Sequence, residues 1–152
     1  MLLVLDPTLI VGHFALIVAA LFAGAALYIN IAEQPARLGL DDQSLLSEWK
    51  PSYKRGFAMQ APLAIAGCVF GLFAWWQTKE LGFLIGGIAM IANWPWTLLG
   101  IMPTNNALMA TEVAAAGPKS RALVVKWGTL HAVRTVLGII ATVAFFWAEV
   151  SN

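Results

Sequence analysis

The side chains best suited to acid–base chemistry in this sequence are His131, Glu33 and Arg134. Trp127, His131 and Arg134 recur at helical spacing, so they share one helix face whose next member is Gly138. An imidazole can accept a proton near neutral pH, and a guanidinium can stabilise negative charge that develops on oxygen. The pattern predicts a site that removes a proton and holds the resulting oxyanion. His131 is the expected base, Arg134 the charge-stabilising group, and Glu33 a second base or the group that orients His131.

A further set of polar and aromatic side chains lies near the ends of the same apolar segments and could bind a substrate. Its members are Tyr28, Asn30, Trp49, Arg55, Trp96, Thr104, Asn105 and Trp127. Convergence of such groups on a mainly apolar cavity is the usual form of a ligand site. Each has a structural alternative, because tryptophan at a membrane boundary is commonly an anchor and Thr104 could cap a helix. An ion pair of Arg134 with Glu33, which we expect here, could likewise do no more than fix helix register.

Long stretches without charge predict the helices that carry these residues. The chain of 152 residues is 60% hydrophobic and 11% charged, with a mean hydropathy of +0.77. About 20 apolar residues suffice to cross a membrane as a helix. Four segments qualify, at about residues 8–32, 56–78, 81–102 and 122–148. We therefore expect an all-α integral membrane protein, an up-down bundle of four transmembrane helices forming one domain over residues 1–152.

The same composition excludes several classes of protein. A soluble domain of this size could not bury so much apolar side chain, and a disordered segment would carry far more charge. A net charge of +1 provides no basic surface for nucleic acid. The single cysteine, Cys68, excludes a disulfide framework and any site with several thiolate ligands.

Basic residues predict how the bundle is oriented. The first and third connections carry six Lys or Arg residues and the second carries only Lys79. The positive-inside rule places the first and third connections in the cytoplasm and both termini outside, and we expect a bacterial inner membrane. Short interfacial helices are expected in these two connections. One runs from Asp41 to Trp49 and ends at Pro51, and the other covers residues 105–116.

Several sequence blocks resemble the anthrone oxygenase-like family of small four-helix membrane proteins. They are Ala23-Gly24-Ala25-Ala26-Leu27-Tyr28-Ile29-Asn30, Glu33-Gln34-Pro35-Ala36-Arg37-Leu38, Trp49-Lys50-Pro51-Ser52-Tyr53-Lys54-Arg55, Pro95-Trp96-Thr97, Met102-Pro103-Thr104-Asn105 and Trp127 to Thr135. The resemblance covers nearly the whole chain. It implies oxidation of an anthrone to an anthraquinone by dioxygen without a bound cofactor, and a hydrophobic aromatic small molecule as substrate. The family's polar blocks fall here on Glu33, Arg37, Trp49, Arg55, Thr104, Asn105, Trp127, His131 and Arg134.

Three classes of function stay open at this point. The first is a membrane oxygenase acting on a flat phenolic, anthrone or quinol-type substrate. The second is a non-enzymatic quinone- or lipid-binding protein, or an accessory subunit of a larger membrane complex. Assembly as a homo-oligomer is compatible with the sequence. The third is a haem or metal oxidoreductase, which is weakest because His131 and the structural His13 lie far apart along their helices. We expect no metal site and no cofactor, although a bound haem, metal or quinone is compatible with the sequence.

Overall fold

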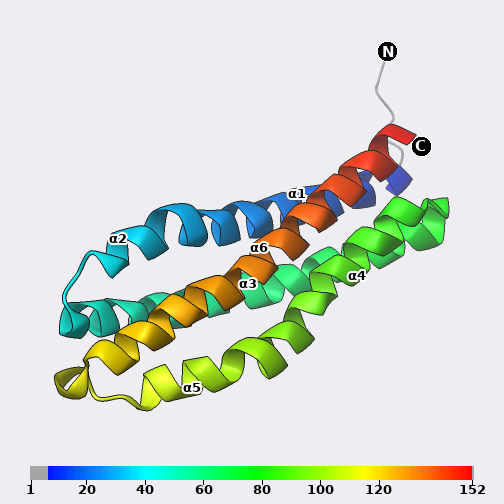
Figure 1. Cartoon of the computed structure of the whole chain (residues 1–152). Coiled ribbons are helices and arrows are strands. Elements are labelled where there is room, and N and C mark those ends of the chain that lie inside the picture. Colours follow the sequence, from blue (N-terminus) through cyan, green and yellow to red (C-terminus); the bar gives the residue numbers. More distant parts are fainter. Residues whose placement is uncertain (1–6, 152) are drawn as a thin grey trace.

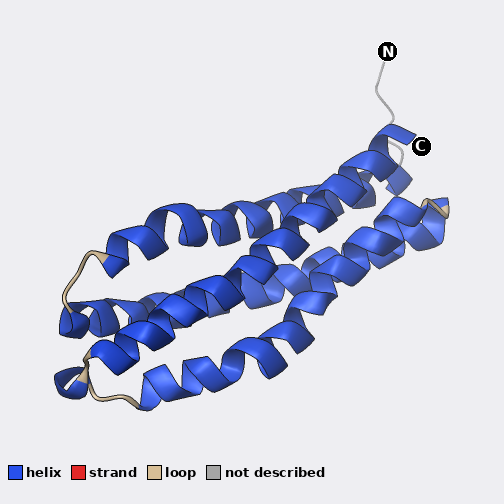
Figure 2. Cartoon of the chain, viewed as in Figure 1, coloured by secondary structure: helices blue, strands red, loops and turns tan. Residues whose placement is uncertain are grey.

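The computed structural model describes residues 7–151 as a bundle of four long helical segments that run up and down (Figure 1). The longest elements are α1 (Pro7–Tyr28), α3 (Asp42–Thr78), α4 (Leu81–Trp96) and α6 (Pro118–Ser151). Helices α1 and α4 each pack against both α3 and α6. The described residues contain helices and loops but no strand (Figure 2). The predicted all-α bundle of four membrane-spanning helices is confirmed.

Four helical segments are long and apolar enough to cross a membrane. They are Ile10–Leu38, Asp42–Thr78, Leu81–Ala110 and Pro118–Ser151, of 29, 37, 30 and 34 residues. At 1.5 Å per residue, the longest exceed a hydrocarbon core of roughly 30 Å. The chain is therefore an integral membrane protein whose helices extend beyond the apolar layer. We call the end of the bundle that carries α2 (Gln34–Leu38) and α5 (Met102–Ala110) the polar end.

Two π-helical turns interrupt the first and third spans near the polar end. The turn η1 (Ile29–Glu33) joins α1 to α2, and η2 (Thr97–Ile101) joins α4 to α5. Each is followed two residues later by a proline, Pro35 or Pro103. A proline has no N–H to donate and its ring crowds the carbonyl four residues earlier. A wider turn just before the proline relieves both problems, and such turns are frequent at functional sites.

The interfacial helix expected from Asp41 to Trp49 begins as predicted but does not end at Pro51. Asp41 caps α3 by accepting hydrogen bonds from the backbone N–H groups of Gln43 and Ser44, at 3.1 and 3.0 Å. Hydrogen bonds from Ser44, its side chain first and then its backbone, lower the pKa of the Asp41 carboxyl. The helix then continues through Pro51 to Thr78 because Trp49 is buried in a core cluster that holds this segment against α5 and α6.

The third connection also differs from its predicted boundaries. Residues 105–116 do not form one helix, because α5 ends at Ala110 and a single 3₁₀ turn, η3 (Val113–Ala115), follows it. Lys50 on α3 secures this connection by donating to the backbone oxygens of Met109 and Thr111, at 3.1 and 2.6 Å. These carbonyls lie at the end of α5, where a helix leaves its last carbonyls without internal partners.

Small residues allow close helix packing in the apolar half of the bundle. Gly71 on α3 and Gly86 on α4 both face the ring of Phe145 on α6, and a Cβ atom at either position would clash with that ring. Phe145 is fully buried. Gly-xxx-Gly spacing on α3 and α4 therefore does mark an interface. The similar spacing of Ala20 and Gly24 on α1 does not, because a Cβ at Gly24 would meet no atom within 4 Å.

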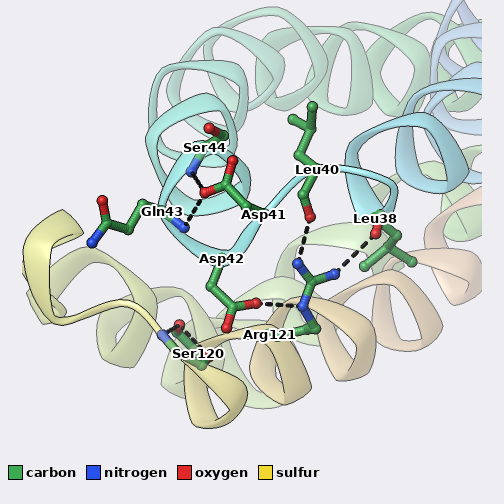
Figure 3. Close-up of polar contacts among 9 residues, drawn as sticks. Leu38, Leu40, Asp41, Asp42, Gln43, Ser44, Ser120 and Arg121 are labelled. Atoms are coloured by element: carbon green, nitrogen blue, oxygen red, sulfur yellow. Dashed lines mark hydrogen bonds and ion pairs between the residues drawn. The ribbon is translucent and has the colours of Figure 1, made fainter.

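Arg121 ties the polar ends of three helical segments together (Figure 3). Its guanidinium donates to the carboxylate of Asp42 at the start of α3, and to the backbone oxygens of Leu38 and Leu40. The two carbonyls belong to the end of α2 and the loop that follows it. A single planar donor on α6 thus satisfies groups that the α2–α3 connection would otherwise leave without partners.

We expect Arg121→Gln to lower the free energy of unfolding by about 1–2 kcal/mol, because a partly exposed charged donor to three acceptors is lost. Denaturation in mixed micelles of increasing SDS content measures this change. Lys119→Gln removes the same charge from a neighbouring exposed position that makes no such bonds, and should change stability by less than about 0.5 kcal/mol. Equal stability of the two variants would contradict the assigned role of Arg121.

Candidate functional site

A small polar cavity lies inside the bundle at its polar end. Its volume is about 20 Å³, which is room for roughly one water molecule. Side chains from η1, α2, α3, η2, α5 and α6 surround it: Ile29, Arg37, Ser52, Tyr53, Gly56, Phe57, Gln60, Ile101, Asn105, Trp127, His131 and Arg134. Four of the predicted site residues, Asn105, Trp127, His131 and Arg134, therefore come together around one cavity.

His131 is held in one orientation by a short chain of hydrogen bonds. Asn30 donates through Nδ2 to the backbone oxygen of Gly128 at 2.9 Å, which leaves Oδ1 as its acceptor. That oxygen lies 2.9 Å from His131 Nδ1 and accepts the hydroxyl of Thr135 at 2.7 Å. Because an amide oxygen can only accept, Nδ1 is the protonated nitrogen and Nε2 carries the lone pair. The imidazole lining the cavity thus has its basic nitrogen available.

The structure gives Asn30 a different part from the one predicted. Both polar atoms of its side chain are engaged, one with Gly128 and one with His131 and Thr135. It therefore has no free polar atom with which to bind a substrate, as its place in the predicted site required, and it orients His131 instead. Glu33 was expected as a possible orienting group, and that alternative is wrong because Asn30 occupies the position next to Nδ1.

Trp127 fixes the plane of the His131 ring. The two rings are stacked, with centroids 4.9 Å apart and an interplanar angle of 29°. The Arg37 guanidinium lies over the same indole at 5.7 Å from its centroid, and Trp49 meets it edge-on at 5.7 Å. Trp49 is fully buried and does not line the cavity, so it is not free to stack on a substrate as predicted. It stacks instead on Tyr53, which does line the cavity, at 5.0 Å.

Arg134 is buried without a carboxylate partner among the described residues. Only 7% of its surface is exposed, and its guanidinium carbon lies 5.5 Å from the centroid of the Phe22 ring. Its Nε is buried with no hydrogen bond. A guanidinium in this state can stabilise an anionic oxygen strongly, because the low local dielectric leaves the charge poorly screened.

The expected ion pair between Arg134 and Glu33 is wrong. Glu33 bonds instead to Arg37 and to the hydroxyl of Ser52, and Arg37 also contacts Glu48 at 3.1 Å. Glu33 and Arg37 are four residues apart, so they are neighbours along one side of the helical segment. Glu33 therefore reaches Arg37 on its own helical segment, whereas an ion pair with Arg134 would have to bridge two helices.

Two buried amides beside the cavity, one of them next to the Tyr53 phenol, have polar atoms without a hydrogen bond of normal geometry to the described part of the chain. Asn105 is 1% exposed, and neither its Nδ2 nor its Oδ1 makes a hydrogen bond. Gln60 is 1% exposed, and its Nε2 makes none either. Buried polar atoms of this kind are rare in folded proteins because each one costs about 1–3 kcal/mol. Both amides can complete their hydrogen bonds with a polar group of a ligand.

The remaining predicted residues lie outside this cavity. Tyr28, Glu33 and Arg55 line a second hollow, an outer groove of about 540 Å³ between α1 and α3. Trp96 donates through Nε1 to the backbone oxygen of Leu130 at 3.0 Å, so its polar atom joins two helices. Thr104 is buried and lines neither hollow.

Five cavity residues on α3 were not predicted as site residues, namely Ser52 and four that share one face of the helix. Tyr53, Gly56, Phe57 and Gln60 follow one another at offsets of three, four and seven positions, which places them on one helix face. The signal was present in the sequence, because Gln60 is the first polar residue inside an otherwise apolar span and lies two turns from Tyr53. Following that face along the helix would have found them.

The polar side chains that line the cavity are an imidazole, two guanidiniums, two amides, a phenol, a serine hydroxyl and an indole. Among residues 7–151, no three His, Cys, Asp or Glu side chains gather in a way that could hold a metal ion. His13, at the other end of the bundle, has its Nδ1 3.7 Å from a Glu149 carboxylate oxygen. The groups around the cavity are those that bind oxygen atoms of an organic molecule.

The known proteins similar to this chain are described as anthrone oxygenases. A family model described as anthrone oxygenase matches residues 49–144. An anthrone oxygenase of Claviceps purpurea is 29% identical over 150 residues, covering 88% of this chain and 86% of that protein. Another from Aspergillus fumigatus is 29% identical, covering 85% and 86%, and one from a Cryptosporiopsis species is 28% identical, covering 87% and 81%. No solved structure matches the chain.

Proposed function

Because this chain belongs to the anthrone oxygenase family, we propose that it oxidises a flat, lipid-soluble phenolic or anthrone-type substrate with dioxygen at the polar end of its bundle. One observation carries the proposal. A histidine with its basic nitrogen available, an arginine without a carboxylate partner and an amide without partners surround the same cavity. These are the base and the oxyanion donors that such a reaction requires.

The first step is removal of a proton from the substrate. An anthrone has a ring CH₂ group opposite its carbonyl, and loss of one proton gives an enolate whose charge rests largely on the carbonyl oxygen. Nε2 of His131 accepts the proton, while Arg134 and Asn105, which line the same cavity, stabilise the superoxide and peroxide oxygens that form at the deprotonated carbon. Asn30 and Thr135 act as positioning residues, since they hold His131 in the required tautomer.

The second step consumes dioxygen without a cofactor. The enolate gives one electron to O₂, and the resulting radical and superoxide combine to form a C–O bond at the deprotonated carbon. The protonated His131 returns its proton to the peroxide. Loss of the second C–H proton and cleavage of the O–O bond then give a ring carbonyl and water. One O₂ and one CH₂ group thus become one C=O group and one H₂O, and the imidazole is restored.

The proposed mechanism assigns a role only to residues of one copy of the chain. Lipids surround the exposed apolar faces of the helices, such as Leu99 at 80% exposure. Assembly with further copies or with larger subunits stays a prediction of the sequence, which this mechanism does not use.

Turnover by the purified protein tests the proposal. The protein is placed in lipid nanodiscs and mixed in air with 1,8-dihydroxyanthrone. Formation of 1,8-dihydroxyanthraquinone is followed by its visible absorbance, and oxygen uptake by an electrode. We expect one O₂ consumed per anthraquinone formed, well above the rate in empty nanodiscs. Binding of the anthraquinone without turnover would favour a non-enzymatic quinone-binding protein instead.

We also propose that both termini face away from the cytoplasm, in a bacterial inner membrane. The residues that support this orientation are the basic ones of the polar end, Arg37, Lys50, Lys54, Arg55, Lys119 and Arg121. Helix α1 begins and α6 ends at the opposite end (Figure 1). A phosphatase that is active only outside the cytoplasm, fused after Asn152, should therefore be active. Activity instead from a fused fluorescent protein that folds only in the cytoplasm would reverse the orientation.

A further inference from the structure

We propose that the substrate reaches the polar cavity sideways, from the outer groove between α1 and α3, and that Ile29 and Gly56 form the gate between the two hollows. This inference rests on the proposed function and adds the route and the residues that select the substrate by size. It also predicts where the rings of the substrate lie during the reaction. Those rings stay in the groove, and only the reacting edge passes the gate.

The two hollows meet at three shared residues. Ile29, Ser52 and Gly56 line both the inner cavity of about 20 Å³ and the outer groove of about 540 Å³. The groove is bordered by exposed apolar side chains, Tyr28 at 61% and Met59 at 49% exposure, and by the charged Arg55. An aromatic molecule dissolved in the membrane could therefore enter the groove along its apolar border.

The sizes of the hollows decide how a substrate must lie. Pockets that hold drug-sized ligands measure about 300–1,000 Å³, a range that includes the groove and excludes the inner cavity. A three-ring molecule thus fits the groove, whereas the inner cavity has room for little more than one small group. A carbonyl oxygen or a C–H edge that passes the gate would meet His131 and Arg134.

Gly56 forms one side of the gate and has no side chain, and Ile29 forms the other side on an irregular helical turn. A Cβ atom at Gly56 would lie 3.9 Å from Cδ1 of Ile29, which is van der Waals contact, so these two residues close the passage between the hollows until Ile29 moves. Ile29 is the first residue of η1, where the backbone follows a π-helical turn rather than a regular α-helix. Such turns are less stable than α-helical ones, which makes a shift of Ile29 inexpensive.

Ser52 and its partners form the polar frame of this opening. The Ser52 hydroxyl bonds to Glu33, and Arg37 donates to the same hydroxyl at 3.0 Å. Arg37 is buried and also holds Glu48, so both carboxylates on the groove side are tied to one guanidinium. These groups can accept hydrogen bonds from phenolic hydroxyls of a ring system lying in the groove. The chemistry of the frame fits a flat polyphenolic substrate.

A reversible block of the gate tests the inference on folded protein. A Cys68→Ser background removes the native thiol, and Gly56→Cys introduces one thiol at the gate. The purified variant in nanodiscs is modified with benzyl methanethiosulfonate. Stopped-flow absorbance then measures the association rate of 1,8-dihydroxyanthraquinone, and kcat/KM for 1,8-dihydroxyanthrone is measured in parallel. Val69→Cys in the same background is the matched control, on the same helix and 57% exposed.

We expect modification of the Gly56→Cys variant to lower both rates roughly tenfold or more, and dithiothreitol to restore them. The Val69→Cys control should change less than twofold. Ile29→Cys places the thiol on the other side of the gate and should behave like Gly56→Cys, including if the latter folds poorly. Unchanged rates after complete modification of either gate variant would overturn the inference and leave the proposed oxidation standing. Blocked anthraquinone binding in a protein that never oxidises the anthrone would support the gate and reject the reaction.

Discussion

His131→Ala is expected to lower kcat for 1,8-dihydroxyanthrone by roughly 10²–10⁴-fold, the usual cost of losing a general base. The affinity for 1,8-dihydroxyanthraquinone should change far less, because the rings of the ligand lie in the outer groove and Arg134 still meets the oxygen. Product formation in air and equilibrium binding of the anthraquinone measure the two quantities separately. Added imidazole should restore part of the rate if the lost function is proton transfer.

Glu33→Gln is the matched control for this experiment. Glu33 lines the outer groove, and its partner Arg37 keeps a second carboxylate, Glu48. We therefore expect its kcat to stay within about tenfold of the wild type, since no group that touches the reacting atoms is changed. Equal rates in the wild type, His131→Ala and Glu33→Gln would contradict the proposed reaction at this site. They would not contradict the fold.

Arg134→Leu is expected to lower kcat by about 10²–10³-fold, the effect typical of removing one oxyanion donor. The protein should still fold, because no carboxylate within residues 7–151 depends on Arg134 and leucine suits the contact with Phe22. Arg134→Lys should recover little of the loss, since an ammonium cannot reproduce the planar fork of a guanidinium. Steady-state kinetics on the three proteins gives the comparison.

A charge change elsewhere on the same helix serves as the control for Arg134. Lys126→Leu removes one positive charge two turns away, at an exposed position outside the cavity, and should leave kcat within about twofold. Normal turnover by Arg134→Leu would make this arginine purely structural. It would then leave Asn105 and Gln60 as the donors nearest the reacting oxygen.

The sequence by itself determined the class of the protein and the helix face that carries the chemistry. Charge-free segments long enough to cross a membrane leave few alternatives to a helical bundle, because every backbone N–H must be satisfied within its own segment. Spacing within one regular helix is equally well determined. Trp127, His131, Arg134 and Gly138 are all buried on α6, as their positions predict.

Only the tertiary structure decided which side chains on different helices meet. Whether Arg134 contacts Glu33, or Asn30 contacts His131, depends on how each helix is rotated about its axis and shifted along it. The π-helical turn at Ile29–Glu33 adds to this, since one extra residue in a turn rotates everything after it by about 100° relative to a regular α-helix. Asn30 and Glu33 both lie within this turn, and their side chains reach different partners. Asn30 thus reaches His131, while Glu33 pairs with Arg37 at the outer groove.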